Sequence, residues 1–223
     1  MGSGASEWGG DGMTVSVLDP IMVAEGVDKA MSRHGYSDIY ERYLSEWQHD
    51  PIRLLEIGVQ EGRSLRAWER YFSTAEIIGV DIDPGCQEVR HARASIVIGD
   101  QRDREFMKSL GKFDVVIDDG SHVWKDQIAS FRALFPLMDA GGLYFIEDVQ
   151  TSYWWKYKSA GPTTVEFFKM LVDDLNNRGR LIWSQIDRCV PSTRGKLRRY
   201  QGKIGFIHWY PGMIVIQRSE VKK

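Results

Sequence analysis

Residues 53–64 read RLLEIGVQEGRS, an apolar run that leads into two glycines four positions apart. The run predicts a buried β-strand over residues 53–58, and Gly58 and Gly62 permit a tight turn into a helix that begins near Ser64. A dinucleotide-binding turn carries glycines two positions apart, and position 60 is Gln60. The stretch therefore predicts the first strand-turn-helix unit of an α/β sheet, without the dinucleotide fingerprint.

Strands and helices alternate after this unit, as in a parallel sheet that is covered by helices on both faces. Further strands are expected at residues 76–81, 95–98, 113–118 and 142–147, with β-rich segments at 180–187 and 204–217. Helices are expected at residues 64–72, 87–92, 103–110, 122–137 and 163–177. Helical spacing of apolar residues over 18–47 predicts an N-terminal helical cover at 17–48. We expect one domain over residues 14–223, after a disordered stretch at 1–13.

Composition narrows the kind of partner. A length of 223 residues suits one α/β domain, and a net charge of −2 gives no general attraction to nucleic acid or to an anionic membrane. Two cysteines, Cys86 and Cys189, lack metal-ligand spacing and fit a reducing compartment. No apolar run approaches the roughly 18 residues that span a bilayer. We expect a cytoplasmic protein with neither a nucleic-acid nor a membrane partner.

Acidic residues end nearly every expected strand. They are Glu56, Asp81, Asp100, the pair Asp118 and Asp119, and the pair Glu147 and Asp148. Open α/β sheets bind ligands beyond the carboxyl ends of their strands, so these side chains are expected at one site. Crowded carboxylates repel one another unless cations accompany them. The pattern therefore indicates cationic ligands.

The acid-x-Gly-x-x-x-Gly pattern at residues 56–62 resembles the first motif of class I methyltransferases. The resemblance implies a Rossmann-like fold with a mostly parallel seven-stranded sheet. It also implies the cofactor S-adenosylmethionine, whose positive charges match Glu56. Asp81 is then placed to bind both ribose hydroxyls and Asp100 to meet the adenine amine. The predicted cofactor-binding residues are Glu56, Gly58, Gly62, Ser64, Asp81, Asp100 and Gln101. The alternative is that the glycines serve only helix packing and that Asp81 only forms a turn.

Three of the acids suggest a metal site. Asp119, Glu147 and Asp148 follow the fourth and fifth expected strands, which would be neighbours in this layout. Ligation by oxygen alone favours Mg²⁺ over Ca²⁺ or Mn²⁺. An iron oxygenase site requires two histidines, and only His122 lies in this cluster. The alternative is a set of solvated carboxylates at the strand ends.

His122 is the candidate general base. It stands three residues after Asp119, where a helix is expected to begin. The positive end of a helix dipole and a nearby Mg²⁺ both favour the neutral imidazole that a base requires. His122 and Asp119 are therefore the predicted catalytic residues, and the alternative for His122 is a purely structural role.

Two longer motifs make the resemblance more specific. The sequences DDGSH at 118–122 and IEDV at 146–149 resemble the metal-dependent sugar O-methyltransferases of macrolide and rhamnosylated polyketide biosynthesis. They are also similar to cephalosporin-hydroxylase-like proteins. The sequences GVDK at 26–29 and HGY at 34–36 resemble the lead-in helix of that family.

This resemblance assigns Asp119, Glu147 and Asp148 to Mg²⁺ and His122 to proton removal. It implies a homo-oligomer that methylates a sugar or other hydroxyl of a glycosylated small molecule. Two rival functions stay open at this point. One is methylation of a catechol-like phenol, and the other is a cofactor-binding subunit without catalysis.

Three weaker features have two interpretations each. Tyr153, Trp154 and Trp155 either stack on a sugar or aromatic ring or pack in the core. The basic segment 188–203 either grips a nucleotide-sugar diphosphate or, as we favour, forms a solvated hairpin. Lys29 and His34 either close over the cofactor or lie on an exposed helix face.

Overall fold

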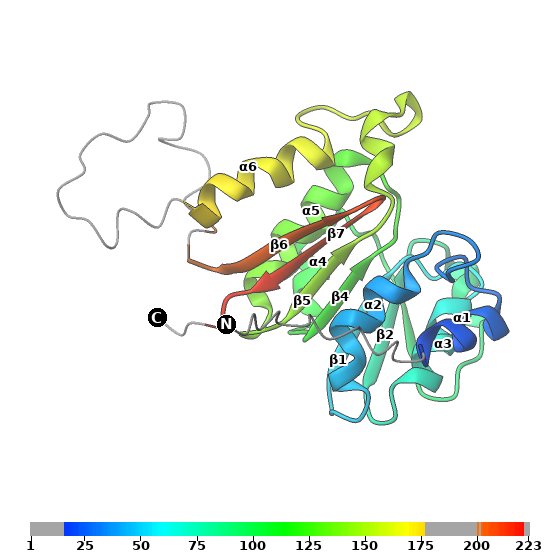
Figure 1. Ribbon diagram of the computed structural model, residues 1–223. Helices are drawn as coiled ribbons and strands as arrows, with labels where there is room; N and C mark the ends of the chain where they lie inside the picture. The colour runs from blue at the N-terminus through cyan, green and yellow to red at the C-terminus, as the bar shows by residue number, and fades with distance from the viewer. Residues whose placement is uncertain (1–15, 177–199, 201, 221–223) are drawn as a thin grey trace, which may run out of the picture.

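A seven-stranded sheet organises the computed structural model, which describes residues 16–176, 200 and 202–220 (Figure 1). The strand order is β3-β2-β1-β4-β5-β7-β6. Strands β1 to β5 pair in parallel, and β7 runs antiparallel to both β5 and β6. The predicted α/β class and the mostly parallel seven-stranded sheet are therefore confirmed.

The strands lie close to their predicted positions. Their bounds are β1 Arg53–Ile57, β2 Glu76–Asp81, β3 Ser95–Ile98, β4 Val115–Asp118, β5 Leu143–Ile146, β6 Ile204–Tyr210 and β7 Met213–Arg218. The segment predicted at 204–217 is a hairpin of two strands, because the chain reverses at Gly212, whose φ is 77°. The strand predicted at 180–187 lies outside the described residues.

The helices depart from prediction at two points. The α-helices are α1 Leu18–Glu25, α2 Ser37–Leu44, α3 Arg63–Tyr71, α4 Arg104–Ser109, α5 Trp124–Leu134 and α6 Thr164–Asn176. The 3-10 helices are η1 Ser45–Trp47, η2 Pro84–Glu88, η3 Phe135–Leu137, η4 Val149–Tyr153 and η5 Trp155–Tyr157. The helix predicted at 87–92 is replaced by the short η2, which begins at Pro84 under the Asp83 cap. Helix α5 begins two residues late, because His122 has a φ of 56° and cannot extend the helix.

Both faces of the sheet are buried. Alternate residues of each strand point to opposite sides, so Leu54 and Leu55 belong to different clusters. One cluster includes α1, α2 and α3, and the other includes α4, α5 and α6 (Figure 1). No helix within the described ranges is long and apolar enough to cross a membrane.

The N-terminal helical cover consists of α1, α2 and the short η1. Gly26 ends α1 with a φ of 70°, a backbone conformation that glycine adopts without steric cost. The loop that follows is closed by the carbonyl of Lys29, which accepts hydrogen bonds from the Tyr36 and Ser37 amides at 2.9 Å each. This loop directs the Lys29 side chain toward the strand ends.

The sheet brings the candidate residues to one place. Strand β1 pairs with β2 on one side and with β4 on the other, so the winding of the chain reverses between β1 and β4. Ligands of open α/β sheets bind at such a point. Asp118 lies opposite both Ile57 and Ile146. Gly58, Asp119 and Glu147 therefore follow three adjacent strand ends, as predicted for the fourth and fifth strands.

Candidate active site

Two cavities form a continuous cleft at the carboxyl ends of the strands. One has a volume of about 250 Å³ and the other of about 430 Å³, and Gly58, Gln60 and Asp119 line both. The smaller cavity lies between the loop after α1 and the strand ends, and the larger one lies beside β2, β3 and the start of α5. The larger cavity alone falls within the roughly 300–1,000 Å³ typical of small-molecule sites.

The glycine turn is shaped by close packing of backbone. Gly58 has a φ of 96°, and a Cβ atom built there would lie 2.2 Å from the carbonyl oxygen of Asp119. Gly62 has a φ of 66°, and its Cβ would lie 2.6 Å from the Nε2 of His91. Both glycines are required by their conformation and surroundings, and their role in cofactor binding stays a prediction.

Asp81, the last residue of β2, holds the glycine turn against this strand by hydrogen bonds. Its Oδ2 accepts hydrogen bonds from the Val59 and Gln60 amides at 2.7 and 3.1 Å, and its Oδ1 accepts one from the Asp83 amide at 2.9 Å. Burial alone raises the pKa of the Asp81 carboxyl, but these backbone donors outweigh it and the net pKa is lowered. Asp81 is thus an ionised acceptor on the wall of the larger cavity.

Two predicted cofactor residues have protein partners. Asp100 accepts from Arg102 with both oxygens, at 2.5 to 2.9 Å. Gln101 accepts from the Ser121 amide at 2.8 Å and donates to Asp118 at 3.3 Å. Both residues line the larger cavity, but their side chains serve the loops around it.

Glu56 lies behind the cleft. It is fully buried and lines neither cavity. Its Oε2 accepts from the Trp68 indole at 3.2 Å, and its Oε1 lies 3.8 Å from the Lys29 ammonium. Burial raises the pKa of Glu56 to about 7, although Lys29 opposes the shift. Ser64, in the first turn of α3, lines the smaller cavity and also bonds to Glu56.

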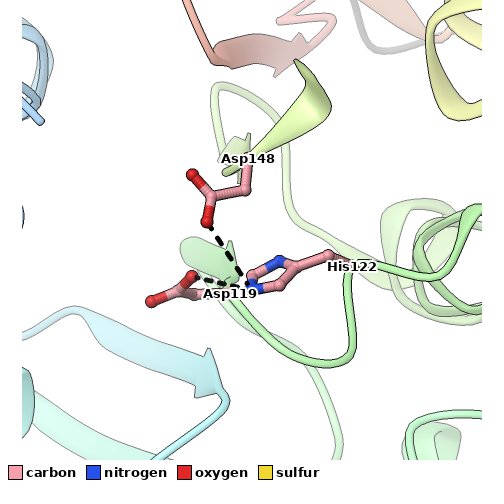
Figure 2. Close-up of side chains that lie close together, drawn as sticks. All are labelled: Asp119, His122 and Asp148. Atoms are coloured by element: carbon pink, nitrogen blue, oxygen red, sulfur yellow. Dashed lines mark ion pairs between the residues drawn. The ribbon is translucent and has the colours of Figure 1, made fainter. Parts of the chain in front are cut away.

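Asp119, His122 and Asp148 form a polar triad in the smaller cavity (Figure 2). One side-chain ligand atom from each lies within 4.8 Å of the others. The Nε2 of His122 lies 3.9 Å from Asp119 Oδ1 and 3.6 Å from Asp148 Oδ2. The three side chains are 20 to 23% exposed, so they are open to a ligand from the cleft.

The backbone around the triad is strained. Within the described residues, three non-glycine residues have a positive φ: Gln60 at 48°, His122 at 56° and Asp148 at 53°. This conformation costs an L-residue roughly 1–2 kcal/mol. All three line the smaller cavity. Strain that gathers at one cavity indicates a functional site.

Lys29 takes a position that the sequence did not settle. Its side chain is 2% exposed, which excludes the exposed helix face. The ammonium donates to Asp119 Oδ2 and, at 3.2 Å, to Glu147 Oε2, and Tyr40 donates to Glu147 Oε1. Burial raises the pKa of Glu147 well above its usual range, and Lys29 counteracts it. The three predicted metal carboxylates therefore differ in their partners: Asp148 lies beside His122, Glu147 is bound to Lys29, and Asp119 has both neighbours.

Two residues that orient Asp148 were missed from the sequence. Tyr36 donates to Asp148 Oδ1 at 3.1 Å, and the Gln150 amide donates to the same oxygen at 3.0 Å. Tyr36 and Tyr40 were assigned to the helical cover and to its resemblance to the family's lead-in helix, without a role at the acids. Because a buried tyrosine hydroxyl needs a partner, two such tyrosines beside a group of strand-end acids were the available signal.

Four aromatic residues follow Asp148, and one of them, Tyr157, lies next to His122. Tyr153, Trp154 and Trp155 are 73, 52 and 82% exposed, which excludes core packing. The ring of Tyr157 lies 6.1 Å from that of Trp154 and 6.0 Å from that of His122. His34 is exposed and contacts the ring of Tyr36. Most of the basic segment at 188–203 lies outside the described residues.

Comparison with known proteins identifies the relatives of this site. No family model matches the chain. It is 33% identical to the 8-demethyl-8-alpha-L-rhamnosyl tetracenomycin-C 2'-O-methyltransferase of Streptomyces olivaceus, over 93% of this chain and 56% of that protein. It is 35% identical to the mycinamicin VI 2''-O-methyltransferase of Micromonospora griseorubida, over 65% of this chain and 40% of that one. The chain is homologous to sugar O-methyltransferases.

A solved structure extends these methyltransferase relationships to three dimensions. MycE, a methyltransferase of the mycinamycin biosynthetic pathway solved in complex with Mg and SAH, superposes with a TM-score of 0.77 at 30% identity. The match covers 91% of this chain and 53% of that one. It confirms the predicted Rossmann-like class I methyltransferase fold. The chain spans about half the length of the curated relatives it matches.

Proposed function

We propose that the chain is an S-adenosylmethionine- and divalent-metal-dependent O-methyltransferase that acts on a sugar hydroxyl of a glycosylated small molecule. The observation that carries this proposal is the convergence of Asp119, His122 and Asp148 in a cavity that opens onto the glycine turn. The homologous sugar O-methyltransferases support the same reaction.

The larger cavity fits the nucleoside part of the cofactor. Ile57, Val80 and Ile82 supply apolar walls for a flat ring, and the ionised Asp81 at the turn is a suitable acceptor for ribose hydroxyls. The smaller cavity continues from Gly58 to the triad, where the reacting end of the cofactor would lie. Glu56 lies behind this end, where its Oε1 is 3.8 Å from the Lys29 ammonium.

The triad end fits a hard cation. Asp119 and Asp148 offer carboxylate oxygens, which Mg²⁺ prefers over imidazole nitrogen. Glu147 lies behind them and is the third predicted ligand, which becomes available once the Lys29 ammonium withdraws. When bound, such a cation and the cofactor would supply hydroxyl polarisation and the methyl group, respectively.

We assign to His122 the removal of the proton from the acceptor hydroxyl. Its Nε2 faces the cavity between two carboxylates, at ion-pair rather than hydrogen-bond distance. Those carboxylates stabilise the imidazolium that forms when Nε2 takes the proton. Tyr157 lies beside this ring and Trp154 lies beside Tyr157, so these two rings provide stacking area for the acceptor.

Transfer of a labelled methyl group from S-adenosylmethionine tests the proposal. Rhamnosides, other glycosides and catechols serve as acceptors, with Mg²⁺ or with chelator. We expect transfer to a glycoside that stops with chelator and returns with Mg²⁺. Asp148→Asn should lose activity yet keep its calorimetric affinity for S-adenosylhomocysteine, the demethylated cofactor. The exposed Asp139→Asn variant is the matched control.

Each failure has a separate meaning. Full activity in chelator would show that the reaction needs no metal. The triad acids would then have no role as metal ligands. Transfer only to catechols would show that the acceptor is a phenol rather than a sugar hydroxyl. Intact affinity for S-adenosylhomocysteine without transfer to any acceptor would support the non-catalytic subunit.

A further inference from the structure

Asp148 presents one of its two carboxylate oxygens to the cavity. Its Oδ2 lies 3.6 Å from His122 Nε2, and Figure 2 shows the other oxygen turned away from the ring. That other oxygen, Oδ1, accepts a hydrogen bond from the Tyr36 hydroxyl at 3.1 Å and one from the Gln150 side-chain amide at 3.0 Å. The acid is therefore held by Oδ1 and is left with Oδ2 for a ligand.

The two donors belong to segments that are themselves fixed. Tyr36 is 4% exposed, and its hydroxyl also lies 3.3 Å from the Gly212 carbonyl oxygen. Gln150 lies in η4, where the amide of the preceding Val149 donates to the same carbonyl at 3.1 Å. A rotation that turned both oxygens of Asp148 toward the cavity would break both hydrogen bonds to Oδ1, which is costly at a site where few replacement donors are available.

Asp119 has the same arrangement with a different donor. Its Oδ1 lies 3.9 Å from His122 Nε2, and its Oδ2 accepts from the Lys29 ammonium. Figure 2 shows that this acid also turns one oxygen toward the ring and the other away from it. Asp119 and Asp148 therefore converge on the cavity with one oxygen each.

The number of oxygens that a site offers distinguishes between hard cations. Mg²⁺ takes about six ligands in a nearly ideal octahedron and keeps several waters, so one oxygen from each of two carboxylates is enough. Ca²⁺ is larger, takes about six to eight oxygens, and often binds both oxygens of one carboxylate. Donors that restrict a carboxylate to one oxygen therefore disfavour Ca²⁺ more than Mg²⁺.

We propose that Tyr36 and Gln150 select Mg²⁺ over Ca²⁺ by restricting Asp148 to a single ligand oxygen. This inference rests on the proposed function, in which the triad end binds a divalent cation. Tyr36 and Gln150 act through Asp148 without touching the cation, so they are positioning residues. Without them, Asp148 is free to turn and to offer both oxygens.

Calorimetric titration with each cation tests the proposal without turnover. Mg²⁺ or Ca²⁺ is added to the protein saturated with S-adenosylhomocysteine, and the ratio of the two affinities is the readout. In the double variant Tyr36→Phe/Gln150→Met, the preference for Mg²⁺ should fall by roughly 10- to 100-fold, the usual effect of removing donors behind a metal ligand. Mg²⁺ should bind more weakly, whereas Ca²⁺ should bind as tightly as before or more tightly.

Tyr36→Phe alone should shift the ratio less, because the Gln150 amide still holds Oδ1. The matched control is Tyr43→Phe, which also removes one hydroxyl from the helical cover. The Tyr43 hydroxyl lies 2.6 Å from both His208 and Tyr210 and contacts none of the acids, so this variant should keep the wild-type ratio. Circular dichroism shows whether each variant folds, and Tyr36→Phe carries the test if the double variant does not.

The contrary outcomes are distinct. An unchanged ratio, or an equal weakening of both cations, would show that Tyr36 and Gln150 only support the site, and would overturn the proposed selection. A wild type that binds Ca²⁺ as tightly as Mg²⁺ would overturn it too, while the metal-dependent reaction would stand. A wild type that binds neither cation would overturn the metal site of the proposed function together with this inference.

Discussion

At the triad end of the cleft, Glu147 shares the ammonium of Lys29 with its neighbours, whereas at the end near the larger cavity Asp118 is held by uncharged donors. Gln101 and Tyr144 donate to Asp118 at 3.3 and 3.4 Å. Burial raises the pKa of the Asp118 carboxyl to about 7, although hydrogen bonds oppose the shift. One end therefore balances charge with charge, and the other satisfies buried acids by hydrogen bonding.

This difference separates two tasks. An ammonium that neutralises carboxylates is replaceable by another cation, so the triad end is suited to cation exchange. A network of amide, hydroxyl and carboxylate groups has fixed directions and rigidifies the loop that it supports. The end near the larger cavity is accordingly suited to holding the 119–122 loop in one geometry.

The largest effect is expected for His122→Ala, which tests whether chemistry is confined to the triad end. Turnover should fall by roughly 10²- to 10⁴-fold, the usual cost of losing a general base. Affinity for S-adenosylhomocysteine should stay within about twofold, because the nucleoside cavity is not lined by this side chain. Steady-state transfer assays and calorimetry measure the two quantities.

Calorimetric titration with Mg²⁺ decides between two roles of the same ring. If Mg²⁺ affinity is unchanged in His122→Ala, the nitrogen acts as the base. If it falls along with turnover, Nε2 is a metal ligand and the group of Asp119, His122 and Asp148 is the metal site itself.

An intermediate effect is expected from a matched pair of variants, Lys29→Met and Gln101→Met. Removing the buried ammonium leaves Glu147 and Glu56 uncompensated, which costs roughly 3–5 kcal/mol of unfolding free energy. Removing the Gln101 amide takes a hydrogen bond from partners that are neutral or weakly charged, which costs roughly 1–3 kcal/mol of unfolding free energy. Urea denaturation measures both losses.

Adding Mg²⁺ should distinguish these two variants further. It should recover part of the stability of Lys29→Met, since a second cation can replace the first, and it should leave Gln101→Met as unstable as before. Equal losses of unfolding free energy that do not change with Mg²⁺ would show that the two ends do not differ in how they stabilise their buried acids.

The smallest effect concerns Glu56 and pH. Its pKa is about 7 in the folded chain, above the usual value of 4.5. Between these values the folded state holds the proton that the unfolded state releases, so this group lowers stability as pH rises from 4.5 to 7. Glu56→Gln should flatten that part of the stability curve in urea denaturation. An unchanged slope would mean that Lys29 keeps Glu56 ionised throughout.

The sheet was predictable because its signals are local. Apolar runs, turn glycines and an acid after each strand are read within a few residues, and β2 and β3 occupy their predicted spans. The adjacency of β4 and β5, and with it the closeness of Asp119 to Asp148, followed from the ordinary connection rules of such sheets.

The finer site was not predictable, because it depends on distant partners. Whether Lys29 is exposed or buried is decided by acids about 90 and 118 positions away. Whether Glu147 faces a ligand or the interior depends on Tyr40, 107 positions earlier. The left-handed backbone at His122 and Asp148 has only a weak sequence signal, because His and Asp adopt this conformation more often than most residues but far less often than glycine.

The long reach of the N-terminal loop has a consequence for biosynthesis. Tyr36 and Lys29 leave the ribosome early, yet Lys29 meets Glu147 only after 118 more residues are made, and Tyr36 meets the Gly212 carbonyl after 176. This segment is translated before the strands that it contacts, and it is thus among the last to complete its contacts. Until then the nascent chain carries an unneutralised ammonium and apolar tyrosines, which leaves it dependent on protection from aggregation while translation proceeds.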